Sequence, residues 1–184
     1  NISNLKNSQN YFFVKGSITD KKLMSKLIND CDVVINFAAE SHVDRSISNP
    51  KPFIDSNILG VFNILEIIKK QKKRLLHVST DEVFGSLKTI SANEEYRLNP
   101  SSPYSASKAS AELLINSYVR TFEINSVITR CTNNYGPKQF PEKLIPKTII
   151  LASRNEKIPI YGTGKSIRDW IFVDDHCDAI MDVL

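Results

Sequence analysis

Apolar residues follow two patterns that alternate from one end of the chain to the other. Some form short, almost continuous runs, such as Val33, Val34 and Ile35, which are typical of strands buried on both faces. Others recur every three or four positions, which favours a helix with one apolar face. The first pattern predicts strands at 11–14, 31–39, 75–79, 126–131 and 158–161. The second predicts helices after the N-cap residue Asp20 and at 52–70, 102–122, 141–153 and 174–184.

The order of these elements limits the fold class. Because buried strands alternate with helices, we predict an α/β fold built on a parallel, doubly wound, Rossmann-like sheet. Ligands of such sheets bind at the carboxyl ends of the strands. Polar residues follow three predicted strands, at 40–42, 80–82 and 133–134. We therefore expect a binding site at that edge of the sheet.

The charge of the chain is weakly basic and spread along its length. The net charge is +4 and the pI about 8.9. The densest basic cluster, at 69–74, ends a predicted helix, where cations interact favourably with the last carbonyl groups. We interpret this cluster as a solvated helix end and expect no nucleic-acid partner.

Cysteine spacing and hydropathy bear on the compartment and on metal binding. Cys31, Cys131 and Cys177 are odd in number, far apart and without C-x-x-C spacing, which is typical of reduced thiols in a cytosolic protein. His42 has no second histidine at ligand spacing, so we expect no metal site. No apolar run approaches the roughly 18 residues of a membrane span, and the first residues show no signal or transit pattern. We expect a soluble, cytoplasmic protein without a membrane partner.

The glycine pattern bears on the completeness of the sequence. A dinucleotide-binding fold opens with a strand, a glycine-rich turn and a helix. The six glycines, at 16, 60, 85, 136, 162 and 164, form neither G-x-x-G-x-x-G nor G-x-G-x-x-G. We therefore expect a fragment of a longer chain, with a βαβ-sized unit of roughly 30 residues or more missing at the front and a tail missing at the end.

One pair of residues indicates redox chemistry. Tyr104 and Lys108 are four residues apart on a predicted helix and therefore share a face. A tyrosine titrates near pH 10, but a neighbouring lysine cation and a positively charged nicotinamide ring would favour the phenolate and lower its pKa. Thr80, at the end of a predicted strand, could share the hydrogen bond to a substrate hydroxyl. A Y-x-x-x-K pair alone is a weak signal, and Thr80 strengthens it.

Six motifs together resemble the extended short-chain dehydrogenase/reductase family, and within it the dTDP-glucose 4,6-dehydratases. The resemblance extends from about residue 35 to residue 180. The motifs are N-F-A-A-E-S-H-V-D-R-S at 36–46, S-T-D-E-V-F-G at 79–85, P-Y-S-A-S-K at 103–108, T-R-C-T-N-N-Y-G-P at 129–137, Q-F-P-E-K-L-I-P at 139–146 and R-D-W-I-F-V-D-D-H at 168–176. Y-x-x-x-K marks the superfamily, and T-D-E marks the dehydratases.

The resemblance implies a dehydration through a transient ketone. Tyr104 would take the C4 hydroxyl proton while a hydride passes from C4 to NAD, and Lys108 and Thr80 would assist. The ketone acidifies the C5 proton, which Glu82 would remove. Asp81, protonated, would expel the C6 hydroxyl as water. Hydride return to C6 gives a 4-keto-6-deoxy sugar, and an adjacent acid and base require surroundings that separate their pKa values.

The resemblance also implies NAD as cofactor and identifies candidate contacts to it. Those outside the catalytic pair are Ser17, Ile18, Phe37, Ala38, Ala39, Glu40, Ser41, Ser56 and Asn134. Tyr104 and Lys108 would contact the ribose–nicotinamide half. Ser17 replaces the usual Asp of a Gly-Asp-Ile stretch, which removes an anionic acceptor for the adenine amine. Phe84 replaces a common Tyr and loses only a hydroxyl.

Candidate contacts to a nucleotide-sugar substrate follow from the same resemblance. They are Ser41, Thr80, Asn133, Lys143, Leu144, Pro159, Ile160, Tyr161 and Arg168. Arg168 and Lys143 suit a diphosphate, which needs cationic donors. A local ion pair with Asp169 is the alternative reading of Arg168.

The resemblance leads to a domain division, a partner and a biological setting. Residues 1–135 would form an NAD-binding Rossmann-like domain, incomplete at its N-terminus, 136–168 a substrate-binding segment, and 169–184 a truncated return to the first domain. Helices 52–70 and 102–122 would form a homodimer. The usual setting is dTDP-rhamnose biosynthesis. The alternatives are a nucleotide-sugar 4-epimerase, which does not need Asp81 and Glu82, and a catalytically silent nucleotide-sugar or NAD binder.

Overall fold

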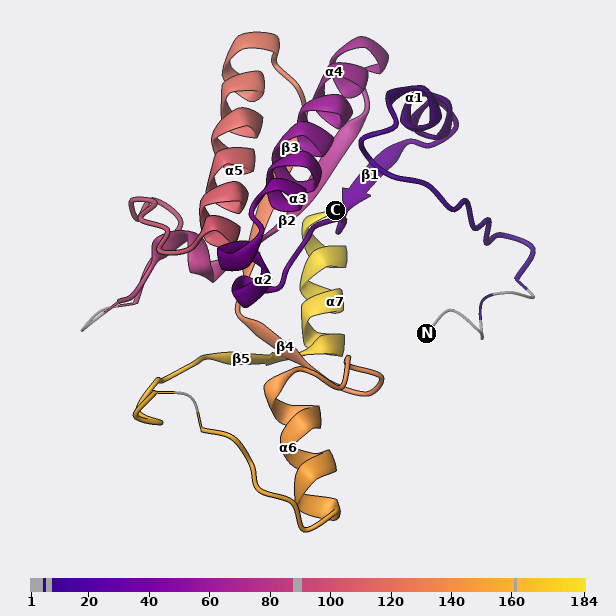
Figure 1. Cartoon of the computed structure of the whole chain (residues 1–184). Helices are drawn as coiled ribbons and strands as arrows, with labels where there is room; N and C mark the ends of the chain where they lie inside the picture. Colours follow the sequence, from indigo (N-terminus) through magenta and orange to yellow (C-terminus); the bar gives the residue numbers. More distant parts are fainter. Residues whose placement is uncertain (1–4, 6–7, 88–90, 161) are drawn as a thin grey trace. The chain divides into compact units, whose positions relative to one another are not determined.

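The computed structural model describes residues 5, 8–87, 91–160 and 162–184 (Figure 1). The chain divides into two compact units. The larger unit is Val14–Cys131 with Leu184, and the smaller unit is Thr132–Val183 with the residues up to Phe13. Parallel strands and helices in both units confirm the predicted α/β class. The domain division predicted after residue 135, with a return at 169, stays a prediction.

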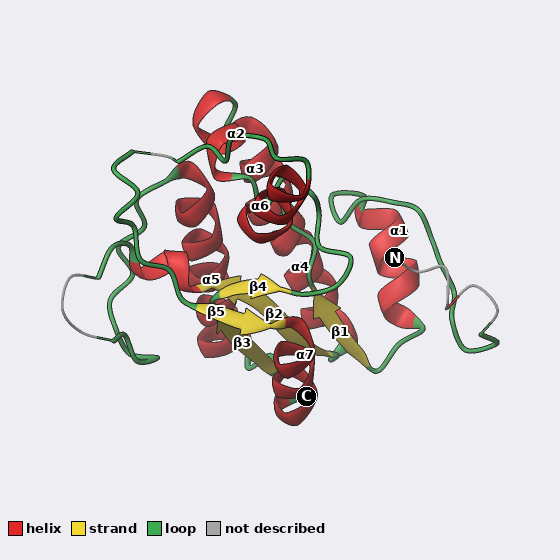
Figure 2. Cartoon of the chain, turned by 90° about the horizontal axis from the view of Figure 1, so that it is seen from below, coloured by secondary structure: helices red, strands yellow, loops and turns green. Residues whose placement is uncertain are grey.

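The larger unit is built on a three-stranded parallel sheet, shown in yellow in Figure 2. Its strands are β1 (Val33–Asn36), β2 (Arg74–Thr80) and β3 (Ser126–Cys131), with β2 in the middle. Three predicted strands are thereby confirmed, the first shorter than expected. Burial on both faces holds for most of β2 but is wrong for β1, where Ile35 is 38% exposed. Among the described residues β1 pairs with β2 alone and therefore forms an edge.

Three helices of this unit contribute to its main core. They are α1 (Lys21–Asn29), α4 (Val61–Gln71) and α5 (Pro103–Phe122), and α4 and α5 lie side by side (Figure 1). The Oδ1 atom of Asp20 accepts a hydrogen bond from the Leu23 amide at 3.0 Å, which confirms the predicted N-cap. The core is the apolar cluster Ile28, Val61, Ile64, Leu65, Ile67, Ile68, Leu75, Ala111, Ile115, Tyr118 and Ile124.

The helix predicted at 52–70 is confirmed but contains a π-helical segment. Helix α3 (Lys51–Phe53) continues into the π-helix η2 (Ile54–Gly60) and then into α4. A π turn holds one residue more than an α turn, and such turns are frequent at functional sites. The π turn surrounds Asn57, which is 1% exposed and accepts a hydrogen bond from the Glu40 amide in the loop after β1. The apolar period predicted the helix but not the extra residue.

The smaller unit contains a second, two-stranded parallel sheet. It pairs β4 (Asn133–Tyr135) with β5 (Trp170–Phe172), and its helices are α6 (Leu144–Ser153) and α7 (Val173–Val183). Both helices were predicted; the two strands were not, nor was the short helix α2 (Val43–Ser48) of the larger unit.

Two predicted strands are wrong. Residues 11–14 and 158–160 form no strand, and Tyr161 lies outside the described residues. Phe12 is 84% exposed and Ile160 is 76% exposed. A strand needs the ladder of a neighbouring strand, and no such ladder involves these segments in the described part of the chain.

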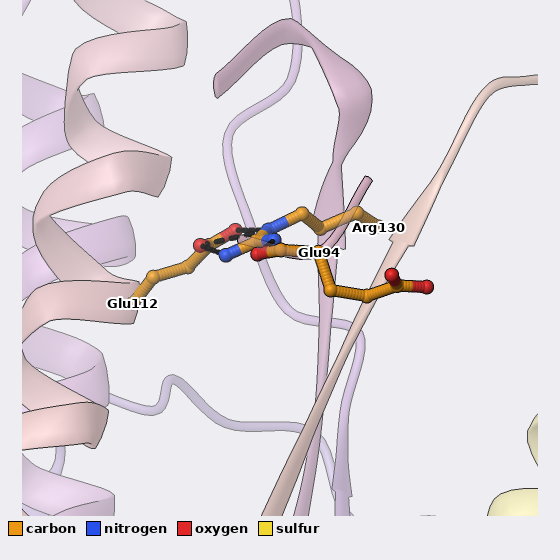
Figure 3. A network of polar contacts seen from close by, with 3 residues as sticks. All are labelled: Glu94, Glu112 and Arg130. Carbon is orange, nitrogen blue, oxygen red and sulfur yellow. Dashed lines mark hydrogen bonds and ion pairs between the residues drawn. The ribbon is translucent and has the colours of Figure 1, made fainter. Parts of the chain in front are cut away.

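A buried ion pair ties α5 to β3 (Figure 3). Glu112 is fully buried, and one of its oxygens lies 2.8 Å from Nη2 of Arg130. Arg130 also donates from Nη1 to the carbonyl oxygen of Glu94 at 2.8 Å, and its guanidinium lies 5.0 Å from the ring centre of Phe84. One side chain thus connects the helix, the strand, the 91–99 loop and the turn that follows β2.

Replacing Arg130 by methionine is expected to leave the Glu112 carboxylate buried without its partner, at a cost of roughly 3–5 kcal/mol in the free energy of unfolding. The double variant Arg130→Met with Glu112→Leu should recover most of that loss, because no buried charge remains. Urea unfolding followed by circular dichroism measures both values. Equal losses in the single and double variants would contradict the prediction.

Candidate functional site

The five predicted catalytic residues all belong to the larger unit. Thr80 is the last residue of β2, and the 3₁₀ turn η3 (Asp81–Phe84) begins directly after it. Thr80 caps this turn, since its Oγ1 accepts a hydrogen bond from the Glu82 amide at 3.3 Å. The capped turn therefore fixes Thr80, the Asp81 side chain and the Glu82 backbone relative to one another.

Asp81 and Glu82 lie in different surroundings. Asp81 is half-buried and its Oδ1 accepts a hydrogen bond from Thr80 Oγ1 at 3.2 Å, whereas Glu82 is exposed. The turn ends at Gly85, whose φ of +70° suits glycine and whose added Cβ would lie 2.2 Å from the Asn99 carbonyl oxygen. Unequal surroundings are what an adjacent acid and base require.

Helix α5 presents Tyr104 in its first turn. Ser102 and Ser105 form a reciprocal capping box, and Pro103 occupies the first helical position. The Tyr104 amide donates to Ser46 Oγ at 3.1 Å, which links α5 to α2. The ring of Phe53 meets the Tyr104 ring edge-on, with 6.3 Å between the ring centres. Position and ring orientation of Tyr104 are thus fixed from two sides.

The pKa of Tyr104 differs from the expectation. Burial raises the pKa of Tyr104 to about 12, the carboxylates of Glu82 and Asp81 add to the rise, and a hydrogen bond with Thr80 opposes it. The predicted lowering by Lys108 is wrong for the chain by itself. The Nζ atom of Lys108 donates instead to the Val78 carbonyl oxygen at 2.7 Å.

The side chain of Lys108, on α5, is buried against β2. Lys108 is 3% exposed, and burial lowers the pKa of Lys108 to about 8. Besides Val78, its Nζ lies 3.3 Å from Nε2 of His77, which is 1% exposed. Burial, and then the Lys108 cation, lower the pKa of His77 to about 3.

Sequence reasoning missed four buried polar residues around the site. They are Asn36, Ser46, Asn57 and His77. Asn36 and His77 each interrupt an apolar strand, which is a usable signal, because a buried polar side chain must find a hydrogen-bond partner. Ser46 and Asn57 carry no such signal, since α2 and the π turn were not predicted.

The predicted cofactor contacts at 37–41 form a loop after β1. Asn57 fixes this loop: its Oδ1 accepts from the Glu40 amide at 2.9 Å, and its Nδ2 donates to the Glu40 carbonyl oxygen at 3.0 Å. Asn57 Nδ2 also donates to Ser107 Oγ on α5 at 2.8 Å. Phe37, Ala38, Glu40 and Ser41 are exposed, and Ala39 is half-buried.

The other predicted cofactor contacts of the larger unit lie outside this loop. Ser56 is half-buried in the π-helix η2. Ser17 is exposed, and its hydroxyl is hydrogen-bonded to the Thr19 hydroxyl. Ile18 is half-buried, and its side chain fills the space that a Cβ at Gly60 would need. A loop with exposed backbone, fixed by a buried amide at the carboxyl end of a parallel strand, fits an extended ligand.

The remaining predicted contacts belong to the smaller unit. Asn134 lies on β4, where its Oδ1 is 2.8 Å from Nδ1 of His176. Asn133 Nδ2 donates to the Asp169 carbonyl oxygen at 3.1 Å, and Arg168 Nη1 donates to the Ile167 carbonyl oxygen at 2.8 Å. Lys143 precedes α6 as its N-cap residue, and Leu144, Pro159, Ile160 and Arg168 are exposed. Tyr161 lies outside the described residues.

Over the described ranges, no three His, Cys, Asp or Glu side chains are grouped so that they could hold a metal ion. No helix within the same ranges is both long and apolar enough to cross a membrane.

The chain is similar to known proteins along its whole length. The family model described as GDP-mannose 4,6 dehydratase matches residues 1–184. The low-salt glycan biosynthesis protein Agl12 of Haloferax volcanii is 45% identical over 185 residues, which cover 100% of this chain and 60% of that protein. A dTDP-glucose 4,6-dehydratase of Xanthomonas campestris is 45% identical over 196 residues, which cover 100% of this chain and 56% of that enzyme.

Solved structures show the same likeness. The dTDP-glucose 4,6-dehydratase DesIV of Streptomyces venezuelae, solved with NAD bound, matches 97% of this chain and 56% of its own with a TM-score of 0.94 and 41% identity. The UDP-glucuronic acid 4-epimerase of Bacillus cereus, solved with UDP-glucuronic acid and NAD, matches 99% of this chain and 58% of its own with a TM-score of 0.94 and 30% identity. The chain thus spans little more than half the length of the relatives it matches.

The buried His77 makes stability depend on pH in a defined direction. Its pKa is about 3 in the folded chain against 6.5 unperturbed, so below pH 6.5 the unfolded state binds more protons and stability falls as pH falls. From pH 7 to pH 5 this loss is about 2 kcal/mol. Urea unfolding at both pH values should show a drop smaller by about that amount in His77→Gln. An equal drop in both proteins would rule out His77 as its source.

Proposed function

The chain belongs to the GDP-mannose 4,6-dehydratase family, and from this premise we propose that the protein containing it is an NAD-dependent nucleotide-sugar 4,6-dehydratase, a hydro-lyase. The proposed reaction converts dTDP-glucose to dTDP-4-keto-6-deoxyglucose and water. The observation that carries the proposal is the pair Asp81 and Glu82 at the capped end of β2, close enough to Tyr104 to raise its pKa.

The residues present fit NAD in part of its length. The exposed loop 37–41 would hold the cofactor along its backbone, with Ser56 and Lys108 toward the ribose–nicotinamide half and Ser17 and Ile18 toward the adenine. Asn134 would lie near the nicotinamide. When bound, NAD supplies the hydride acceptor and a positive charge that favours the phenolate of a nearby tyrosine.

Tyr104 would act as the base of the first step. Its raised pKa means that the free phenol holds its proton at neutral pH. The positive charge of a bound nicotinamide ring beside Tyr104 would oppose the effect of Glu82 and Asp81 on the pKa of Tyr104. The phenolate of Tyr104 could then take the proton of the C4 hydroxyl. Thr80, which already bonds to Tyr104, would accept or donate the second hydrogen bond to that hydroxyl.

Asp81 and Glu82 would carry the elimination. Once C4 is a ketone, the C5 proton is acidic, and exposed Glu82 would take it. Half-buried Asp81 would give a proton to the C6 oxygen, so that the C–O bond breaks and water leaves. Hydride addition at C6 and proton return to C5 complete a reaction without net oxidation or reduction.

The substrate contacts of the smaller unit suit a diphosphate sugar. Arg168 and Lys143 would supply the cationic donors for the diphosphate. Ser41 in the larger unit would face the sugar, and Asn133, Leu144, Pro159, Ile160 and Tyr161 would surround the remaining parts of the substrate. Several relatives that share 45% identity are named dTDP-glucose 4,6-dehydratases, which supports dTDP-glucose as the substrate.

A nucleotide-sugar 4-epimerase is the second candidate, supported by the epimerase structure at 30% identity. It would use Tyr104, Lys108 and Thr80 but has no need for the Asp81–Glu82 pair. A C4 epimer without dehydrated product would select it. A silent binder of NAD or nucleotide-sugar would give neither product.

We also propose that the protein is a cytoplasmic homodimer. Exposed apolar side chains occur along the helical segment 51–71 and along α5, and they are Ile54, Leu59, Phe62, Leu113 and Phe122. Burying them against a second copy would remove apolar surface from water.

Glu82→Gln is expected to lower the rate of 4-keto-6-deoxy product formation by roughly 10²–10⁴-fold, because the amide cannot take the C5 proton. The full-length protein is assayed with NAD and dTDP-glucose, by product absorbance in alkali. Glu95→Gln, in an exposed part of the 91–99 loop, is the matched control and should keep full turnover. Unchanged turnover in Glu82→Gln would contradict the role of Glu82 as the base that takes the C5 proton.

Leu113→Glu is expected to shift the full-length protein from dimer to monomer, since Leu113 is 60% exposed on α5 and a charge there opposes burial. Size-exclusion chromatography with light scattering measures the mass. Leu87→Glu, at another exposed leucine outside these helices, should leave the dimer intact. A dimer in both variants would argue against an interface at this part of α5.

A further inference from the structure

Two buried polar side chains connect the loop after β1 to Lys108. Asn36 on β1 and His77 on β2 are register partners, and they are 4% and 1% exposed. Asn36 Nδ2 lies 3.1 Å from His77 Nδ1, and His77 Nε2 lies 3.3 Å from Lys108 Nζ. None of the steps proposed above uses Asn36 or His77, although burying each of them costs free energy that hydrogen bonds must offset.

The direction of these hydrogen bonds is fixed at one end. The backbone N–H of Ala38 can only donate, and it donates to Asn36 Oδ1 at 3.1 Å. The Asn36 oxygen is thus directed to Ala38, and its NH₂ group donates to His77 Nδ1. An Nδ1 atom that accepts carries no proton, so the neutral ring of His77 carries its proton on Nε2.

The Nε2–H group of His77 therefore points at the amine of Lys108. An ammonium group has three donors and no acceptor, so in that form two N–H groups would face each other. An uncharged amine accepts from Nε2–H with its lone pair and still donates to the Val78 carbonyl oxygen at 2.7 Å. Turning the Asn36 amide would place its NH₂ group against the Ala38 N–H group, and moving the ring proton to Nδ1 would place that proton against the Asn36 NH₂ group. Either change only moves the donor–donor contact to another pair of groups.

We propose that Asn36 and His77 are positioning residues for Lys108, which hold its amine and favour the uncharged form over the ammonium ion. The inference rests on the proposed function, in which Lys108 serves the redox step. The series of hydrogen bonds that starts at Lys108 ends at Ala38, in the loop that is proposed to carry the cofactor. Asn36 and His77 thus connect that loop with the protonation of Lys108.

The other titratable groups around Lys108 are few. Cys131 at the end of β3 and Glu112 on α5 raise the pKa of Lys108, while burial, the largest effect, lowers it. Tyr104 lies one helical turn away on α5, and His77 faces the amine from β2. The hydrogen bonds favour the uncharged amine, as burial does, whereas Cys131 and Glu112 act in the opposite direction.

Asn36→Asp reverses the direction of the hydrogen bonds from residue 36 through His77 to Lys108, with almost no change in the shape of the side chain. A carboxylate accepts on both oxygens, one from Ala38 N–H and one from His77, so the ring proton belongs on Nδ1. The freed lone pair of Nε2 then accepts from the Lys108 ammonium. Asn125→Asp is the matched control, because it adds the same charge at an exposed position.

The first measurement is ¹⁵N NMR of labelled histidine rings in the full-length protein, with His77 assigned from the signal missing in His77→Gln. The wild type should show a protonated Nε2 and an unprotonated Nδ1 at pH 7, and Asn36→Asp a protonated Nδ1. A wild-type ring protonated on Nδ1, or on both nitrogens, would overturn the proposal. This readout needs no catalysis and decides the proposal even if the protein has no dehydratase activity.

The second measurement is the titration of ¹⁵N-labelled Lys108 Nζ, assigned from Lys108→Met. Its midpoint should rise by roughly one pH unit in Asn36→Asp, as for a cation that gains a favourable partner, and stay in place in Asn125→Asp. The pH profile of 4-keto-6-deoxy product formation from dTDP-glucose should move with it. An unmoved midpoint in Asn36→Asp would overturn the proposal, whereas a wild type that forms no 4-keto-6-deoxy product would overturn only the proposed function.

Discussion

Burial of the Lys108 amine between β2 and α5 is the constraint on which the larger unit depends. A buried amine loses its water and must be satisfied by fixed partners, here the Val78 carbonyl oxygen and the ring of His77. Both partners belong to the middle strand of the sheet, so α5 can slide or rotate on β2 only by breaking them. The same contacts therefore set the position of Tyr104, one turn earlier on the helix.

Three residues at four-residue spacing divide the attachment of α5 among its neighbours. Tyr104 is bonded through its amide to Ser46 and packs on Phe53, Lys108 meets β2, and Glu112 meets Arg130 on β3. Residues four apart lie on one face of a helix, so these contacts form a single stripe. The stripe combines the reactive phenol with the contacts that hold the helix.

The sequence reveals much of this arrangement but not all of it. Apolar periods predicted the strands and long helices of the larger unit, whereas the catalytic roles of Thr80, Tyr104 and Lys108 stay a prediction. The pKa of Tyr104 could not be foreseen, because it depends on burial and on Glu82 rather than on spacing to Lys108. The strand at 11–14 failed because the apolar pattern says nothing of a pairing partner. Asn57 was missed because a π turn leaves no mark in an apolar period.

The π turn makes the length of this helix as important as its composition. One residue less between Ile54 and Gly60 would restore an α turn and leave the flanking helices nearly in phase, but it would change the face on which the residues inside the π turn lie, Asn57 among them. Phe53 and Asn57, which now face Tyr104 and the loop at Glu40, could not both keep those contacts. A deletion of one residue within the segment would therefore break the hydrogen bonds by which Asn57 connects the loop at Glu40 to α5.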